Sequence, residues 1–352
     1  MRKSIKLAIA ALLVSAPAVA NAAPVNLENP LYLPGAGNVY SKTSAGVMYK
    51  TLENNLINKY NGTIGDAQFP IWRVREQLGV GITDRFAVQG AFGYTANPDG
   101  DRNGMSEGRV GLIYRLLQDN APFVLDIYAD AHLGGVTPMK MDAMNNKNPA
   151  TGIGFHYNNY TTGQYGVFGG MRVGHTFENK VTFGLFSEFL YTLPGDNTRI
   201  TTTGLTNIAG LPYPMSVFRA HGLPDSFSVN LKQTWDWNTG LNLGYEIAPT
   251  WTTNFALTWK HHAEHTITKV NLDPSKMTPP TSLVVPGLVA GLTTGMNDAF
   301  DEFIFGLSVA KNLTDNTQLA LYAEYTADNG QWNSVNTTRF KGEIGARFNV
   351  QF

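Results

Sequence analysis

Asp99, Asp101 and Asn103 stand at alternate positions in Asp99-Gly-Asp-Arg-Asn-Gly104, a spacing that could bind calcium. The first half of an EF-hand loop has the same order of oxygen donors and a glycine at its sixth position. Val110, however, occupies the twelfth position, where that loop needs a bidentate Glu. Asp, Asn and Gly are also typical of an ordinary turn, so the pattern favours a turn and leaves the three residues only as candidate cation ligands.

Histidines cluster in Lys260-His-His-Ala-Glu-His265, which invites a metal or acid–base interpretation. On a strand, successive side chains point to opposite faces, so His262 and Glu264 share a face while His261 and His265 lie on the other. Zinc needs three or four converging ligands, and neither face supplies them. The cluster therefore predicts solvated polar residues, and no metal or cofactor is implied.

The C-terminal stretch 341–352 shows most clearly what kind of element would position such residues. Its apolar and polar residues alternate with a period of two, as in a strand with one face to lipid and one to water. One face takes Ile344, Ala346, Phe348, Val350 and Phe352; the other takes Glu343, Arg347, Asn349 and Gln351.

The same alternation predicts about twelve strands along the chain. They lie near 38–53, 69–82, 85–97, 106–117, 123–136, 164–177, 180–193, 227–247, 251–267, 299–311, 317–327 and 338–352. Five short connections, rich in Asp, Asn and Pro, alternate with six long ones. This predicts an all-β fold: a transmembrane antiparallel up-and-down β-barrel with both termini in the periplasm. Glu76 falls on the nominal lipid face, so a bulge or a register error is expected near it.

The N-terminal residues look like an export signal. Arg2, Lys3 and Lys6 precede an apolar run that ends before a small-residue site, which predicts cleavage after Ala22. Residues 1–22 are then a signal peptide, 23–37 a short periplasmic segment outside the barrel, and 38–352 the barrel. The formal net charge is −1 and there is no Cys, which argues against nucleic acid as a partner and excludes thiol chemistry.

The polar face of each strand should line the lumen, and charged residues are frequent on it. The expected basic lining residues are Lys42, Lys50, Arg73, Arg75, Arg109, Arg115, Arg172, Lys341 and Arg347. The expected acidic ones are Asp126, Asp130, Glu188, Glu302, Glu324 and Glu343. One interpretation sets a wall of Arg73, Arg75, Arg109 and Arg115 against an opposing acidic wall of Glu302 and Glu324, which tunes ion selectivity in an open pore. The other is that the charges pair with one another and fill a narrow barrel.

Two long connections are unusually apolar for loops: residues 208–218 and 279–292. Such segments are poorly suited to lie free in water. Three outcomes are open: they fold inward as a constriction, they form an apolar ligand site near the mouth, or they pack on one another as a lid.

The export peptide, the strand rhythm and the terminal Phe resemble Gram-negative outer-membrane β-barrels. The resemblance implies outer-membrane lipid, lipopolysaccharide and the barrel-assembly machinery as partners, with Phe348, Val350 and Phe352 as the assembly signal. The turns at 81–88 and 312–318 resemble those of FadL-like and aromatic-pathway barrel transporters. The sequence leaves the oligomeric state, monomer or trimer, undecided.

Two resemblances to outer-membrane enzymes are partial. Asp130 and His132 resemble part of the omptin protease site, but a second Asp pair cannot be placed. The His-x-Ser-Asn-Gly motif of outer-membrane phospholipases is absent. The predicted function is therefore a non-enzymatic channel for passive diffusion of small polar or charged solutes. The alternatives are a transporter of hydrophobic molecules that uses the apolar loops and a closed structural or adhesive barrel.

Overall fold

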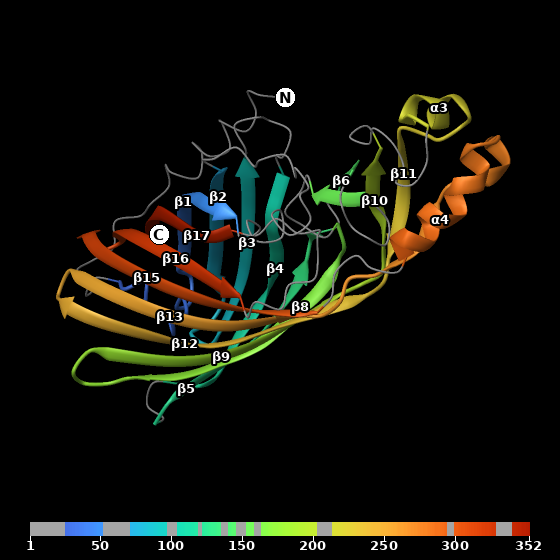
Figure 1. The fold of residues 1–352 in the computed structure, drawn as a ribbon. Helices are drawn as coiled ribbons and strands as arrows, with labels where there is room; N and C mark the ends of the chain where they lie inside the picture. Colours follow the sequence, from blue (N-terminus) through green and yellow to red (C-terminus); the bar gives the residue numbers. More distant parts are fainter. Residues whose placement is uncertain are drawn as a thin grey trace.

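The computed structural model describes residues 25–51, 71–96, 104–118, 122–134, 140–145, 153–157, 163–202, 213–293, 299–328 and 340–352. Twelve antiparallel strands close into a barrel in which the first strand pairs with the last (Figure 1). The barrel strands are β1 (Val39–Thr51), β2 (Ile71–Gly81), β3 (Phe86–Ala96), β4 (Gly104–Leu117), β5 (Val124–His132), β8 (Gly166–Thr176), β9 (Val181–Thr192), β12 (Thr234–Ala248), β13 (Trp251–His262), β15 (Phe300–Thr314), β16 (Thr317–Asp328) and β17 (Phe340–Gln351).

The predicted barrel is confirmed strand by strand, and the largest boundary corrections concern two strands. The segment predicted as one strand over 227–247 is two strands, because the chain leaves the barrel before residue 234. The strand predicted over 251–267 ends at His262. The five short connections all join neighbouring barrel strands and lie at one end, here called the tight-turn end, where both barrel termini also lie.

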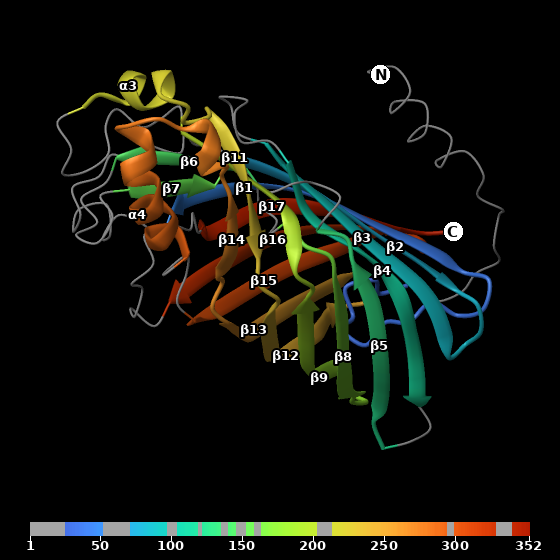
Figure 2. The ribbon, with the colours of Figure 1, turned by 90° about the vertical axis from the view of Figure 1, so that its right-hand side faces the viewer.

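A second sheet, here called the outer sheet, stands at the opposite, long-loop end (Figures 1 and 2). Its strand order is β14-β11-β10-β6-β7, and two helices accompany it. The elements are β6 (Lys140–Asn145), β7 (Ile153–Tyr157), β10 (Gly195–Thr201), β11 (Ser226–Leu231), β14 (Ile267–Asn271), α3 (Met215–Ala220) and α4 (Thr281–Thr293). Most residues of this sheet lie in segments expected to be loops, and the sheet has its own core.

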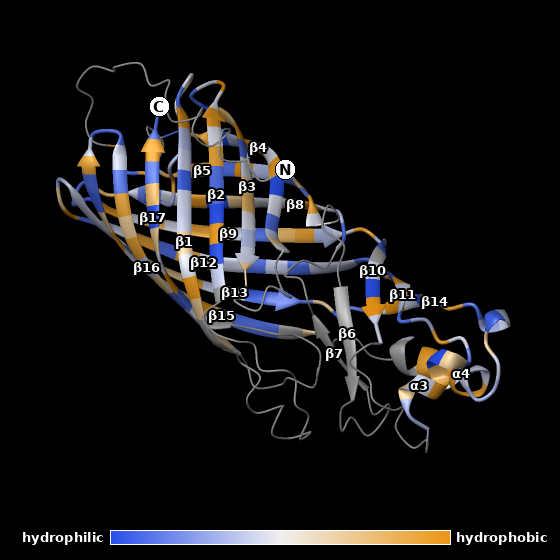
Figure 3. Cartoon of the chain, turned by 90° about the horizontal axis from the view of Figure 1, so that it is seen from above, coloured by the Kyte–Doolittle hydropathy of each residue, from blue (hydrophilic) through white to orange (hydrophobic). Residues whose placement is uncertain are grey.

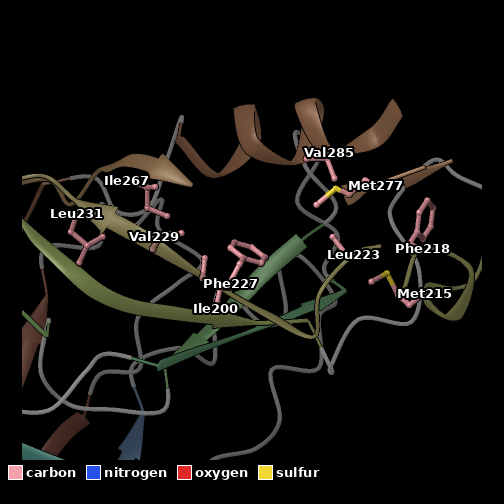
Figure 4. Packing of buried hydrophobic residues seen from close by; sticks show 10 residues of the cluster. All are labelled: Ile200, Met215, Phe218, Leu223, Phe227, Val229, Leu231, Ile267, Met277 and Val285. Carbon is pink, nitrogen blue, oxygen red and sulfur yellow. The ribbon is translucent and has the colours of Figure 1, made fainter. Parts of the chain in front are cut away.

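The two apolar loop segments bury each other in that core (Figure 4). Met215 and Phe218 come from the first segment and Val285 from the second, and all three belong to one cluster with Val229 and Leu231 of β11. Of the three outcomes left open by the sequence, mutual packing is the one found for the described residues of these segments.

The barrel wall has an apolar outside. Figure 3 shows hydrophilic and hydrophobic residues alternating along the barrel strands. The outward side chains include Phe305, Leu307, Leu321, Ile344 and Phe348, all substantially exposed. None of the described helices has the length and hydropathy needed to cross a membrane.

Glu76 lies on this outer face, and the expected bulge is absent. The register of β2 with β1 and β3 is continuous through Glu76. Its two carboxylate oxygens accept hydrogen bonds from Ser41 Oγ at 2.6 Å and Thr43 Oγ1 at 2.5 Å. Local hydroxyl partners, and not a change of register, therefore accommodate the charged residue.

Candidate functional site

Residues 25–37, here called the N-terminal segment, lie across the tight-turn end of the lumen. Val25 N donates to Asp315 O in the β15–β16 turn, at 2.9 Å, and Gly37 N donates to Gly81 O of β2, at 2.8 Å. Between these points the segment reaches the β8 wall, where Leu31 packs over Gly174. The expectation that this segment stands outside the barrel is wrong for the described residues, because side chains of the lumen face bind it.

Two arginines hold the middle of the segment. Arg115 Nη2 donates to the carbonyl of Leu31 at 2.5 Å, while Arg172 donates to the carbonyls of Pro30 at 3.1 Å and Tyr32 at 2.7 Å. Both guanidinium groups also bind the fully buried Asp126, at 2.8 and 2.7 Å. A guanidinium has five donors in a fixed fork, so each arginine binds the carboxylate and the backbone at the same time.

Glu28 anchors the start of the segment to the last strand. Its carboxylate is 2.9 Å from Arg347 Nη1 and accepts from Asn349 Nδ2 at 2.9 Å and from Ser308 Oγ at 3.2 Å. Burial acts to raise the pKa of Glu28, but Arg347, Lys42 and the hydrogen bond from Asn349 together hold the pKa below its ordinary value. The carboxylate is therefore ionised and fully bonded at neutral pH.

Close approach of the segment requires glycine on the wall. A Cβ added to Gly174 would come within 2.8 Å of Leu31 Cδ1 and within 2.2 Å of the carbonyl oxygen of Phe183. The small residue thus leaves the space that the Leu31 side chain fills.

Farther from the tight turns, two more arginines share two carboxylates. Arg73 and Arg75 both bind Glu343, whose side chain is only 3% exposed, and both lie 3.8 Å from Glu324. The hydroxyl of Tyr322 also donates to Glu343. The strand order β2-β1-β17-β16 makes these strands neighbours, so the expected opposition between Glu324 and the arginine wall is wrong.

Other charges also pair locally. Arg109 lies 3.3 Å from Glu107 and 3.7 Å from Asp130, and Gln89 donates to Asp130 at 3.1 Å. At the long-loop end, the ring nitrogens of His262 lie 2.9 Å from Asp236 and 3.2 Å from Glu302. The second interpretation of the sequence, mutual pairing, describes most of the charged lumen residues.

Some expected site residues cannot be placed. The side chains of Lys50 and Lys341 and the candidate cation ligands Asp99, Asp101 and Asn103 lie outside the described residues. Among the described residues, no group of three or more His, Asp and Glu side chains is arranged to hold a metal ion.

Three cavities border the N-terminal segment. One of about 390 Å³ lies toward the tight turns, where Arg115, His175 and Thr176 line it. The other two, of about 310 and 350 Å³, are here called the first and the second cavity, and together the chamber. Both are lined by Pro30, Gln77, Gln89, Ile113, Arg172 and Asn242. Lys42, Arg347 and Glu324 line only the first cavity, and Arg109, Tyr128 and Glu188 only the second. The chamber is therefore polar and lies beside the segment that narrows the barrel.

Sequence reasoning missed Glu28, Tyr322 and the amides of the chamber. Glu28 lies outside every alternating stretch, so no periodicity marks it as a lumen residue. Neutral lining residues such as Asn242 do lie on the predicted inward face, and an inventory of uncharged inward side chains would have found them.

No family model and no curated protein matches this sequence. Among solved structures, an outer membrane channel from Pseudomonas putida F1 shares 11% identity with it, over 91% of this chain and 97% of that protein, with a TM-score of 0.52. The NanC porin shares 10% identity over 88% of this chain and 98% of that protein, with a TM-score of 0.40, too low to support any argument. The likeness to the channel is one of fold, and the fold of this chain is that of an outer-membrane β-barrel.

Proposed function

We propose that this chain is an outer-membrane channel through which small polar solutes pass by diffusion. The main observation that supports this proposal is the polar chamber inside a closed barrel whose outer face is apolar. A chamber lined by amides, hydroxyls and paired charges offers a solute replacements for its hydration. The wall around it faces lipid, so the chamber is the polar route through the membrane.

The N-terminal segment sets the size limit in this proposal. It occupies part of the lumen at the tight-turn end, which is the periplasmic end, and leaves spaces that suit small solutes and exclude oligomers. Its anchors are side chains of the barrel itself, Arg115, Arg172 and Arg347. The limit is thus built into the wall and does not depend on another protein.

The alternative of a hydrophobic-molecule transporter has less support. Met215, Phe218 and Val285 of the apolar loop segments are engaged in the core of the outer sheet. They are not available to line an apolar path into the lumen.

The direct test is the conductance of the refolded mature protein in a planar bilayer, with reversal potentials in a salt gradient. Discrete, stable current steps support the channel. A silent bilayer from a protein that shows the heat-modifiable migration of a folded barrel would overturn it.

Selectivity gives a second test. The double substitution Arg73→Gln and Arg75→Gln leaves Glu343 and Glu324 without their cations, so the reversal potential should shift toward cation selectivity. Lys311→Gln is the matched control, because Lys311 lies outside the lumen over the ring of Trp251. An unchanged reversal potential in the double variant contradicts the assignment of these arginines to the conduction path.

A further inference from the structure

The charges around the chamber are sorted into two levels along the barrel axis. The lower level lies against the N-terminal segment and contains the cations Lys42, Arg115, Arg172 and Arg347, with the carboxylates Glu28 and Asp126. It therefore holds two more cations than carboxylates. Lys42 contributes to this excess, since no ion pair involving it occurs among the described residues, and its Nζ lies 5.6 Å from the centre of the Tyr40 ring.

The upper level has the opposite excess. Its cations are Arg73, Arg75 and Arg109, and its carboxylates are Glu107, Asp130, Glu188, Glu324 and Glu343. Among the described residues Glu188 forms no ion pair; it accepts from the hydroxyl of Tyr128 at 2.7 Å and from Asn238 Nδ2 at 3.4 Å. Five carboxylates against three arginines leave two negative charges in excess, so the residues named for the two levels are dipolar along the barrel axis.

Each cavity reaches both levels. The first is lined by Lys42, Arg347 and Glu28 of the lower level and by Glu324 of the upper one. The second is lined by Arg172 of the lower level and by Glu188 and Arg109 of the upper one. In either cavity a solute therefore meets a cation at the lower level and a carboxylate at the upper one.

The spacing of the levels can be read from the strands. Arg172 pairs with Phe186 in the register of β8 and β9, so Glu188 lies two positions farther from the tight turn. Two positions correspond to roughly 5 Å along the axis, at about 3.3 Å per residue and a strand tilt near 40°. A gap of this size lets one small solute reach both levels.

The neutral lining of the chamber has unused hydrogen-bonding capacity. Gln77, Gln89 and Asn242 line both cavities. Asn254 lines the first, and both of its amide atoms are buried without a partner among the described residues. A buried polar group without a partner needs an occupant of the adjacent space, whether water or a polar solute.

We propose that the chamber favours small zwitterionic solutes, such as an α-amino acid, with the carboxylate toward Lys42 and Arg172 and the ammonium group toward Glu188 or Glu324. This inference rests on the proposed channel function. A simple anion is attracted by the lower level and repelled by the upper one, and a simple cation meets the reverse order. Only a dipolar solute gains at both levels.

The test is osmotic swelling of liposomes that contain the refolded protein, with alanine and lactamide as matched solutes. The two molecules are almost the same size, and lactamide is uncharged. Alanine should enter about fivefold faster than lactamide through the unchanged protein, because fixed charges act strongly in a narrow chamber. Lys42→Gln and, separately, Glu188→Gln should each bring the ratio of the two rates toward one. Lys311→Gln, outside the lumen, is the control and should leave the ratio unchanged.

The outcomes separate the two proposals. If lactamide enters and alanine is no faster in the unchanged protein, the zwitterion preference is overturned while the channel stands. A ratio that stays high in both lumen variants overturns the assignment of Lys42 and Glu188 as the residues that bind the zwitterion. If neither solute enters through a folded barrel, the channel function fails and the preference fails with it. The ratio in the unchanged protein needs no variant, so a substitution that prevents folding does not remove the test.

Discussion

The barrel and the outer sheet are built from the same kind of strand, yet they are opposite in what they bury. Inside the barrel, Asp126 and Glu343 are almost fully buried among arginines, while Leu321 on the outside is 64% exposed. In the outer sheet the interior holds Val229 and Phe218, both with no exposed surface. The difference teaches that the medium outside a sheet, lipid or water, decides which face is apolar.

The largest expected effect comes from placing a charge in the core of the outer sheet. Val229→Asp buries a carboxylate without a partner, which should cost roughly 4 kcal/mol or more and unfold that sheet. Hydrogen exchange should show loss of protection in β10, β11 and β14, while the barrel keeps its heat-modifiable migration. If the outer sheet loses protection and the barrel loses its heat-modifiable migration together, the two regions are one cooperative unit and the contrast between them is wrong.

The barrel should respond to the opposite change, the removal of a buried charge. Glu343→Gln leaves Arg73 and Arg75 beside a neutral amide, at an expected cost of roughly 3–5 kcal/mol to the free energy of barrel unfolding. Glu246→Gln is the matched control, because its exposed pair with Lys180, at 2.7 Å, should contribute less than about 1 kcal/mol. Denaturant titration in lipid measures both, and equal costs would contradict the prediction.

Two exposed leucines test whether the barrel and the outer sheet face different media. Leu321 on the barrel is 64% exposed and Leu283 on α4 is 75% exposed. Leu321→Arg should destabilise the barrel by roughly 2–4 kcal/mol, because that surface meets hydrocarbon. Leu283→Arg should change stability by about 0.5 kcal/mol or less, as expected of a surface in water. Equal unfolding midpoints for the two variants would mean that the barrel exterior does not face lipid.

The smallest effect concerns the N-terminal segment and pH. Because the pKa of Glu28 is below its ordinary value of 4.5, its contribution to holding the segment is complete above that pH and is lost as the pH falls through the lowered pKa. Acidification should therefore loosen the segment and raise the channel conductance. Glu28→Gln should show the raised conductance already at neutral pH and a weaker response to acid. Identical pH profiles for the two proteins would exclude Glu28 as an anchor.

The sequence predicted the barrel because strands between lipid and water carry a period of two, as in Ile344 to Phe352. Arg73 and Asp126, which it assigned to the lumen face, each pair with another residue that it assigned to that face. It did not show which charges meet, because pairing depends on strand order and shear, and these bring Glu324 beside Arg73. Nor did it predict the outer sheet, whose short strands, such as β14 with five residues, are too brief for periodicity to stand out.

The closure of the barrel between β1 and β17 has a consequence for its biogenesis. Tyr40 faces Gln351 in the register, so the wall cannot be completed until the final strand has been delivered. Glu28 binds Arg347 and Asn349 of that same strand, so docking of the N-terminal segment is also incomplete until then. Hairpins of neighbouring strands can form earlier. Closure of the barrel and docking of the N-terminal segment are late events, because both need β17. A truncated product that lacks β17 would present two unpaired edges and is therefore prone to aggregation.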